Sequence, residues 1–145
     1  MKKIIAVCGK SNYGKTETLN ILIDLLSCVI YDYKIEKYNE WTNDRRAVFT
    51  VGKIKVFICT AGDNEEEAKN NINFIKKEKE GMVENVVFTA CHSGKAINRR
   101  VLKQFANQNG YEFIEDPKHD DTQESRRLAT KFFIQVMQQA EEQSD

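Results

Sequence analysis

The sequence lacks the features of an interdomain linker, and it has no excess of charge that would favour a charged partner. It contains one proline, Pro117, and no low-complexity tract or internal repeat, so we expect a single domain over residues 1–145. Its 22 basic and 22 acidic residues give no net charge, which argues against nucleic acid or an anionic membrane as the main partner. No apolar run has membrane-spanning length. Because the N-terminus leads straight into a predicted strand, we expect no cleavable signal and a cytoplasmic location.

The four cysteines form no C-x-x-C pair, so the sequence lacks a common spacing of zinc and redox sites. Three of them, Cys8, Cys59 and Cys91, fall near the C-terminal ends of predicted strands, and His92 follows the last. We interpret them as reduced, buried thiols. A shared metal or redox site is the alternative interpretation.

A glycine-rich segment, GKSNYGKT at residues 9–16, matches the pattern G-x-x-x-x-G-K-[ST]. The apolar run at residues 3–8 predicts a buried strand before it. After it, apolar residues between positions 19 and 26 recur at i, i+3, i+4 and i+7, the spacing of a helix face. This strand-to-helix context favours a phosphate-binding loop over a glycine-rich turn that binds nothing.

The residue types in this segment suit the phosphates of a nucleotide. Glycine permits positive φ and a close approach of the backbone. The unpaired N–H groups of a helix N-terminus can donate to phosphate oxygens. Lys15 would contact the terminal phosphates, and the Thr16 hydroxyl would bind Mg²⁺. The predicted nucleotide-binding residues are Gly9, Asn12, Tyr13, Gly14, Lys15, Thr16 and Glu17.

The rest of the chain alternates between strand and helix patterns. We expect strands at residues 28–33, 45–51, 54–60, 83–90 and 111–114, helices at 63–79, 95–109 and from 121 or 122 to 140, and a loop at 36–44. The runs on either side of Gly52-Lys53 predict a β-hairpin. The alternation predicts an α/β fold with a mostly parallel sheet, helices on both faces and the antiparallel hairpin at one edge.

A magnesium-dependent site also needs a carboxylate near the C-terminal end of a neighbouring strand. The position directly after the apolar run 54–58 is occupied by Cys59. Asp63, four residues further on, is therefore the predicted catalytic and metal-binding carboxylate, and a helix N-cap is its alternative role. Asp32, at the end of the predicted strand 28–33, is the second candidate.

Residues 9–16 resemble the P-loop of the P-loop NTPase superfamily. Residues 48–62 are similar to the switch region of Ras-type GTPases, which carry Asp-Thr-Ala-Gly where this chain has Cys-Thr-Ala-Gly at 59–62. Those enzymes recognise guanine with Asn/Thr-Lys-x-Asp, and the nearest run here is PKHD at 117–120. The resemblance implies a three-layer sandwich of the P-loop NTPase type, and its departure at 117–120 makes ATP the expected nucleotide.

A closer resemblance covers most of the chain. GKSNYGKTETL, NDRRAV, VGKIKVFICTAGD and VFTACHSGKA look like successive blocks of small bacterial P-loop proteins that have no established biochemical role. Those blocks read roughly as Gly-x-x-Asn-x-Gly-Lys-Thr, Asp-x-Arg, Gly-Asp after a strand, and Ala-x-Arg-x-x-Gly. This sequence has His92 where the last block has arginine. The resemblance implies the fold and nucleotide binding but no particular reaction.

Basic residues near the predicted strand ends are candidates to stabilise the charge of phosphoryl transfer. Lys95 is the best placed, because it opens a predicted helix beside a glycine. Arg45 and Arg46 are further candidates, whereas we interpret Arg99 and Arg100 as part of a solvated helix face.

These features together predict a protein that binds ATP with Mg²⁺ and hydrolyses it slowly, using Lys15 and Asp63. A protein partner or a phosphoryl acceptor is left open. One alternative is a small-molecule or nucleotide kinase. The other is a non-catalytic, nucleotide-dependent interaction module, which the cysteine at position 59 favours.

Overall fold

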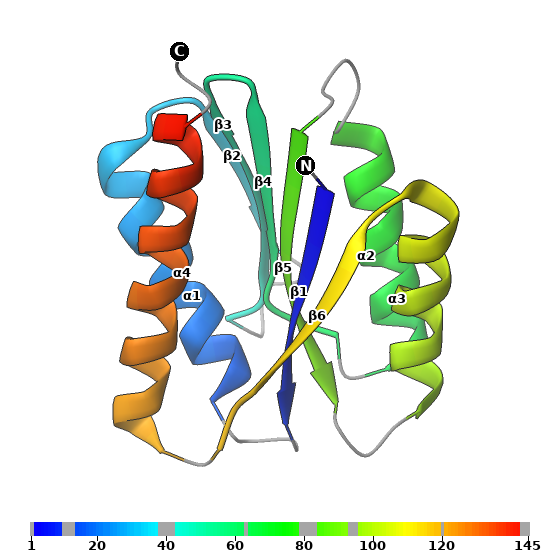
Figure 1. Cartoon of the computed structure of the whole chain (residues 1–145). Helices are drawn as coiled ribbons and strands as arrows, with labels where there is room; N and C mark the ends of the chain where they lie inside the picture. The colour runs from blue at the N-terminus through cyan, green and yellow to red at the C-terminus, as the bar shows by residue number, and fades with distance from the viewer. Residues whose placement is uncertain are drawn as a thin grey trace.

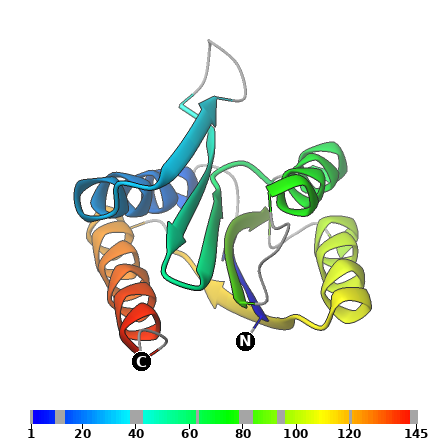
Figure 2. The same ribbon diagram turned by 90° about the horizontal axis from the view of Figure 1, so that it is seen from above.

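The computed structural model describes residues 2–9, 14–37, 43–62, 64–78, 84–92, 96–119 and 121–142. These residues form a six-stranded sheet between two layers of helices (Figures 1 and 2). The strands are β1 (Lys2–Gly9), β2 (Tyr33–Lys37), β3 (Arg45–Val51), β4 (Ile54–Cys59), β5 (Glu84–His92) and β6 (Glu112–Pro117). The helices are α1 (Lys15–Val29), α2 (Glu65–Glu78), α3 (Ala96–Asn109) and α4 (Thr122–Glu142).

The sheet is mixed and has the strand order β2-β3-β4-β5-β1-β6. The last four strands in this order are parallel to one another, whereas β3 is antiparallel to both β2 and β4. The predicted hairpin of β3 and β4 is confirmed, with Gly52 at a φ of 60° in its turn. Its predicted place at the edge is wrong, because β2 pairs with β3 and forms the edge itself.

The strand predicted at residues 28–33 is also wrong. Helix α1 continues to Val29, and the Ile30 N–H still donates to the Leu26 carbonyl at 2.8 Å. Val29 is 56% exposed and Tyr31 is 96% exposed, so this apolar run is not the buried strand that its composition suggested. The edge strand β2 follows it and takes up the first two residues of the loop expected at 36–44.

Helices α1 and α4 cover one face of the sheet, and α2 and α3 cover the other (Figures 1 and 2). The side chains between the layers are apolar on both faces. Phe88 of β5 packs against Phe132 of α4, with ring centroids 4.9 Å apart. On the opposite face Phe57 of β4 meets Phe74 of α2 edge-on at 6.1 Å. The α/β class, the mostly parallel sheet and the helices on both faces are therefore as predicted.

Helix α2 begins at a side-chain cap, because the Glu67 N–H donates to Asn64 Oδ1 at 2.8 Å. Strand β6 is longer than predicted and runs to Pro117 beside the end of β1. Among the described helices, none combines the length and the apolar character needed to cross a membrane.

Candidate functional site

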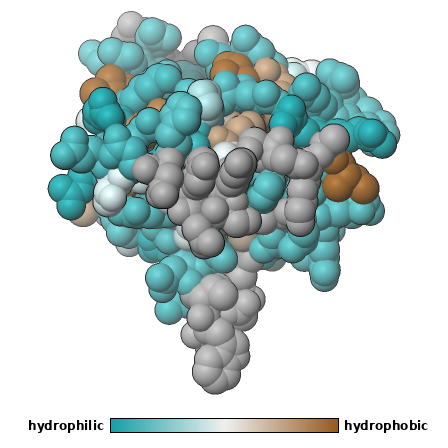
Figure 3. All heavy atoms as spheres, turned by 90° about the horizontal axis from the view of Figure 1, so that it is seen from below, coloured by the Kyte–Doolittle hydropathy of each residue, from teal (hydrophilic) through white to brown (hydrophobic). Residues whose placement is uncertain are grey.

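The candidate site lies where the parallel strands β1, β4, β5 and β6 end, at the lower edge of the sheet in Figure 1. Helix α1 starts at the same edge, just beyond the end of β1. In α/β sheets, ligands gather at the carboxyl ends of the strands. Seen from this side, the coloured part of the surface is mostly hydrophilic (Figure 3). This end of the strands therefore has the position of a ligand site.

Gly14 precedes α1 and has a left-handed φ of 84°. Its carbonyl accepts the Thr18 N–H at 2.9 Å, which closes the first turn of the helix. A Cβ at this position would lie 2.9 Å from Ser125 Oγ and 3.4 Å from Lys118 Nζ. The left-handed backbone therefore favours glycine, and a Cβ would also press on the Ser125 hydroxyl.

Lys15, the first residue of α1, is buried, with 4% of its surface exposed. Its Nζ donates to the Gly9 carbonyl at 2.9 Å and to the Cys91 carbonyl at 3.3 Å. These two carbonyls lie at the ends of the neighbouring strands β1 and β5. The ammonium group is therefore held at the edge where both strands end.

The hydroxyl of Thr16 meets a carboxylate that the sequence analysis did not identify. Thr16 Oγ1 lies 3.3 Å from Asp44 Oδ1 and 3.1 Å from the Thr60 carbonyl. Thr60 Oγ1 in turn donates to Asp44 Oδ1 at 3.0 Å. Residues from three separate segments thus bring four oxygen atoms together beside the start of α1.

Asp44 reaches this place because it directly precedes β3. The start of β3 is fixed to the end of β4, since the Arg45 N–H donates to Thr60 Oγ1 at 2.8 Å and the Thr60 N–H donates to the Arg45 carbonyl at 3.0 Å. The Asp-x-Arg block that contains Asp44 was the signal that could have identified it. That block was recognised only as part of a resemblance, without a role.

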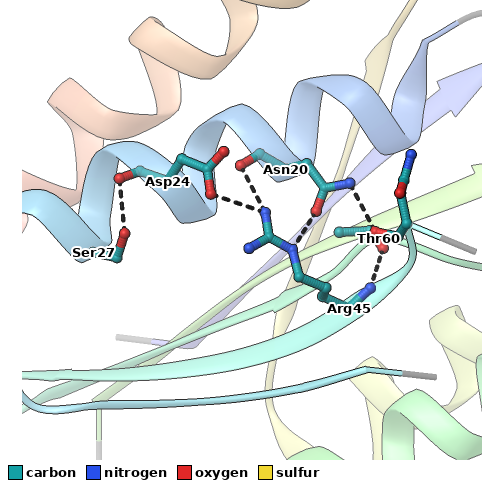
Figure 4. Close-up of polar contacts among 6 residues, drawn as sticks. Asn20, Asp24, Ser27, Arg45 and Thr60 are labelled. Carbon is teal, nitrogen blue, oxygen red and sulfur yellow. Dashed lines mark hydrogen bonds and ion pairs between the residues drawn. The ribbon is translucent and has the colours of Figure 1, made fainter. Parts of the chain in front are cut away.

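Arg45 also fixes this segment to α1 (Figure 4). Its Nε donates to Asn20 Oδ1 at 2.7 Å, and one terminal nitrogen lies 3.0 Å from Asp24 Oδ1. Asn20 Nδ2 donates back to the Asn43 carbonyl at 3.0 Å. The guanidinium group therefore joins β3 to the middle of α1, and its contacts are those of a residue that positions Asp44.

Among the described residues, neither of the two carboxylates predicted from the sequence, Asp63 and Asp32, is seen at the site. Asp63 lies outside the described residues. Asp32 precedes β2, and its carbonyl accepts the Thr50 N–H at 2.9 Å, next to the β3–β4 turn. That turn lies at the opposite end of the strands from the candidate site (Figure 1), so Asp32 is not part of the site. Cys59 is fully buried, and burial raises the pKa of its thiol to about 12.

Of the predicted nucleotide-binding residues, Gly9, Gly14, Lys15 and Thr16 come together at this edge, and Glu17 is an exposed residue of the first turn of α1. Asn12 and Tyr13 lie outside the described residues. His92 is the register partner of Gly9.

Of the predicted basic residues, Arg45 lies at the site beside Asp44, as described above. Arg46 Nε donates to Asn71 Oδ1 at 3.0 Å on the face covered by α2. Arg99 lies 3.5 Å from Glu115 Oε1, and Arg100 is exposed on α3. Lys95 lies outside the described residues.

Lys118 is a second buried lysine, only 2% exposed, and the sequence analysis gave it no role. Its N–H donates to the Cys8 carbonyl at 2.7 Å, which continues the pairing of β6 with β1. Its Nζ donates to the carbonyls of His119 and Asp121. A Cβ on Gly14 would lie 3.4 Å from Lys118 Nζ and 3.6 Å from its Cε, so the end of this side chain lies next to Gly14. The run PKHD was the signal that could have drawn attention to it.

The segment after β4 is held tightly against β5. A Cβ on Gly62 would lie 2.1 Å from the Ala90 carbonyl oxygen, so only glycine fits there. Asn71 Nδ2 donates to the Ala61 carbonyl at 2.7 Å, and Asn98 Nδ2 donates to the Gly62 carbonyl at 3.2 Å. These contacts from α2 and α3 fix the backbone next to Thr60.

An open groove of about 660 Å³ adjoins Thr16 and runs along α1. It is lined by Thr16, Glu17, Asn20, Ile21, Asp24, Lys37, Asn43 and Arg45. A second hollow, of about 290 Å³, lies under α4 beside Lys3 and Ile5, away from the end of β1. Only the first of these two spaces touches the candidate site.

The predicted strand-end cysteines are only partly brought together. Cys8 and Cys91 are register partners, whereas Cys59 pairs with Thr89, two residues before Cys91 on β5. Within the described part of the chain, no three His, Cys, Asp or Glu side chains are grouped so that they could hold a metal ion. A metal ion bound by fewer than three such side chains would need further oxygen ligands, such as hydroxyl groups, backbone carbonyls or water.

Comparison with family models, with curated proteins and with solved structures finds no match to this chain.

Proposed function

We propose that this protein binds ATP together with Mg²⁺ at the end of β1, as a P-loop NTPase-type sandwich, and hydrolyses the nucleotide slowly. The glycine-rich pattern at residues 9–16 and the position of Gly14, Lys15 and Thr16 at the start of α1 support this proposal. The first N–H groups of α1 have no carbonyl partners within the helix and suit phosphate oxygens.

Lys15 supplies the positive charge for the terminal phosphates. Its ammonium group is bound to carbonyls of two strands, so its position is set before a ligand arrives. A preorganised charge in a largely buried setting acts on the phosphates more strongly than a solvated one. In this proposal Lys15 holds the nucleotide and offsets the negative charge on the phosphates during phosphoryl transfer.

The oxygen atoms around Thr16 fit Mg²⁺, which prefers oxygen ligands and retains several water molecules. Thr16 Oγ1 would hold the ion directly, and Asp44 would bind it or orient its water. When bound, Mg²⁺ neutralises part of the triphosphate charge. Asp44 takes the role that the sequence analysis gave to Asp63, and its 3.3 Å distance from Thr16 Oγ1 is the observation that carries this proposal.

The test is the Asp44→Asn variant, because asparagine retains the shape and one acceptor oxygen but removes the charge. We expect Mg²⁺-dependent ATP turnover to fall by roughly tenfold or more, while ATP binding without metal changes little. Phosphate release and calorimetry measure the two effects, with GTP tested beside ATP. Asp32→Asn, at the opposite end of the strands, is the matched control and is expected to behave like wild type.

Equal turnover in Asp44→Asn and wild type would contradict the assignment of Asp44. Binding of Mg·ATP without turnover would favour the nucleotide-dependent interaction module. The open groove beside Thr16 supports the kinase alternative, since it offers space for a phosphoryl acceptor next to the proposed metal ligand. Turnover that rises when candidate acceptors are added would favour the kinase.

A further inference from the structure

Two cysteines lie side by side directly under the candidate site. Cys8 and Cys91 are register partners on the parallel strands β1 and β5, so their side chains point to the same face of the sheet. Together with Ala6 and Leu102 they form a small buried cluster. Cys8 is 7% exposed and Cys91 is fully buried. Both are free thiols.

The backbone of this pair holds the proposed phosphate-binding lysine. Lys15 Nζ donates to the carbonyl of Cys91 itself and to the carbonyl of Gly9, the residue after Cys8. A change in the backbone at Cys8 and Cys91 would therefore move both acceptors of the Lys15 ammonium group. A reaction of these two thiols could therefore change the position of Lys15, although neither cysteine would contact the nucleotide.

The two thiols are chemically unequal. A hydrogen bond from Cys8 lowers the pKa of Cys91, with further help from the positive charges of Arg99 and Lys15, while burial opposes the shift. The same hydrogen bond and burial raise the pKa of Cys8. Because the thiolate is the reactive form, the lowered pKa of Cys91 favours it over Cys8 as the attacking thiol.

We propose that Cys8 and Cys91 form a reversible disulfide that weakens nucleotide binding at the neighbouring lysine. The effect on binding rests on the proposed function, whereas the disulfide does not. With a hydroperoxide as the oxidant, two thiols are oxidised to one S–S bond, and hydrogen peroxide takes up the two electrons and two protons to give two water molecules. A dithiol reductant reverses the step.

The spacing of the strands makes the bond feasible but not free of strain. Neighbouring strands lie about 4.8 Å apart, within the range of about 4.4–6.8 Å found between the Cα atoms of a disulfide. Most disulfides span a larger separation than this, of about 5.5–6 Å, so the two strand ends would have to move apart. That movement displaces the carbonyls that hold Lys15. Strained disulfides are also the ones that are most easily reduced.

The experiment treats reduced protein with hydrogen peroxide, alkylates the remaining thiols and maps the peptides. A Cys28→Ser background removes the exposed thiol on α1, which could otherwise link two molecules. We expect Cys8 and Cys91 to be linked and Cys59 to be alkylated only after denaturation. Free thiols at Cys8 and Cys91 after treatment would overturn the proposal.

The effect on binding is measured by ATP calorimetry before oxidation, after it and after dithiothreitol. We expect at least a tenfold loss of affinity on oxidation and its recovery on reduction. In Cys8→Ser and Cys91→Ser, peroxide should no longer change the affinity. A linked protein that binds as tightly as the reduced one would refute the coupling to Lys15. Reduced protein that binds no nucleotide would refute the proposed function and the effect on binding. In that case the peptide map would still show whether Cys8 and Cys91 form a disulfide.

Discussion

Gly14 shows how much of the site depends on one residue without a side chain. Its φ of 84° is costly for any other residue, and a Cβ would lie 2.9 Å from Ser125 Oγ and 3.4 Å from Lys118 Nζ. Lys118 is itself held by β1 and by the loop before α4. The start of α1 is therefore packed against α4 as well as against the strand before it.

Gly14→Ala is expected to lower the free energy of unfolding by about 2–3 kcal/mol, since left-handed strain of about 1–2 kcal/mol adds to the close contact with Ser125. Urea denaturation measures the loss. Gly52→Ala is the matched control, because Gly52 also has a positive φ, of 60°, but has no neighbouring atom within 4 Å. Its expected cost is the strain alone, about 1–2 kcal/mol. Equal losses in the two variants would show that packing against Ser125 contributes nothing.

The site was predictable at residue scale only where its parts are contiguous in sequence. Gly9, Gly14, Lys15 and Thr16 lie within one motif, so their proximity follows from a strand, a turn and a helix. Asp44 is 28 positions from Thr16, and its approach depends on how β3 aligns with β4. No local pattern contains that alignment, so the sequence pointed first to Asp63, the carboxylate nearest to the predicted strand end, which lies outside the described residues and stays a prediction.

At the scale of elements, the start of β3 is the part that assembles the candidate metal site. Arg45 joins this strand to α1 through Asn20 and Asp24, and its N–H joins it to Thr60 at the end of β4. Asp44 precedes Arg45 and has Thr16 and Thr60 as neighbours. The start of β3, where no metal ligand was predicted, thus places the carboxylate.

Arg45→Ala is therefore expected to act on Mg²⁺ use rather than on phosphate binding. Without the bonds to Asn20 and Asp24, the segment before β3 is less firmly held, so the Mg²⁺ concentration for half-maximal turnover should rise about threefold to tenfold. Metal-free ATP affinity should remain within about twofold, because Lys15 is untouched. Titration of turnover with Mg²⁺ measures the effect, and Arg126→Ala, an exposed arginine on α4, is the control.

A parallel loss of metal-free binding and turnover in Arg45→Ala would contradict a positioning role. It would instead indicate that the arginine contacts the nucleotide directly.

Local patterns predicted most elements, and the exceptions have a physical cause. The strands β1 and β5 are buried on both faces and so read as continuous apolar runs. The run at 28–33 looks similar, but Leu26 is the last buried residue of α1, and the apolar residues Val29 and Tyr31 after it face solvent. Composition alone did not reveal which apolar residues are covered. The position of β2 outside the hairpin likewise depends on pairing between distant residues.

At the scale of the whole molecule, the candidate site joins parts that are far apart in the chain. Lys15 of α1 is bonded to the ends of β1 and β5, Thr16 to the segment after β4, and Asp44 precedes β3. A ligand held by these residues would contact both the helical layer of α1 and the edge of the sheet. Since unfolding would separate all of them, such a ligand should stabilise the fold as a unit.

We therefore expect Mg·ATP to raise the melting temperature of the protein. A ligand at 100 times its Kd stabilises the native state by about 2.7 kcal/mol, which for a chain of this length corresponds to a shift of roughly 8 °C. Lys15→Ala removes the ammonium group and should weaken binding at least tenfold, or about 1.4 kcal/mol, so about half of the shift should disappear at the same ATP concentration. Lys69→Ala, an exposed lysine paired with Glu65 on α2, is the control and should retain the full shift. Thermal unfolding followed by circular dichroism, with Mg²⁺ alone and with Mg·GTP as comparisons, measures the effect. An unchanged melting temperature with either nucleotide would remove nucleotide binding from the function of this edge, whereas an equal shift in Lys15→Ala would place the nucleotide elsewhere on the molecule.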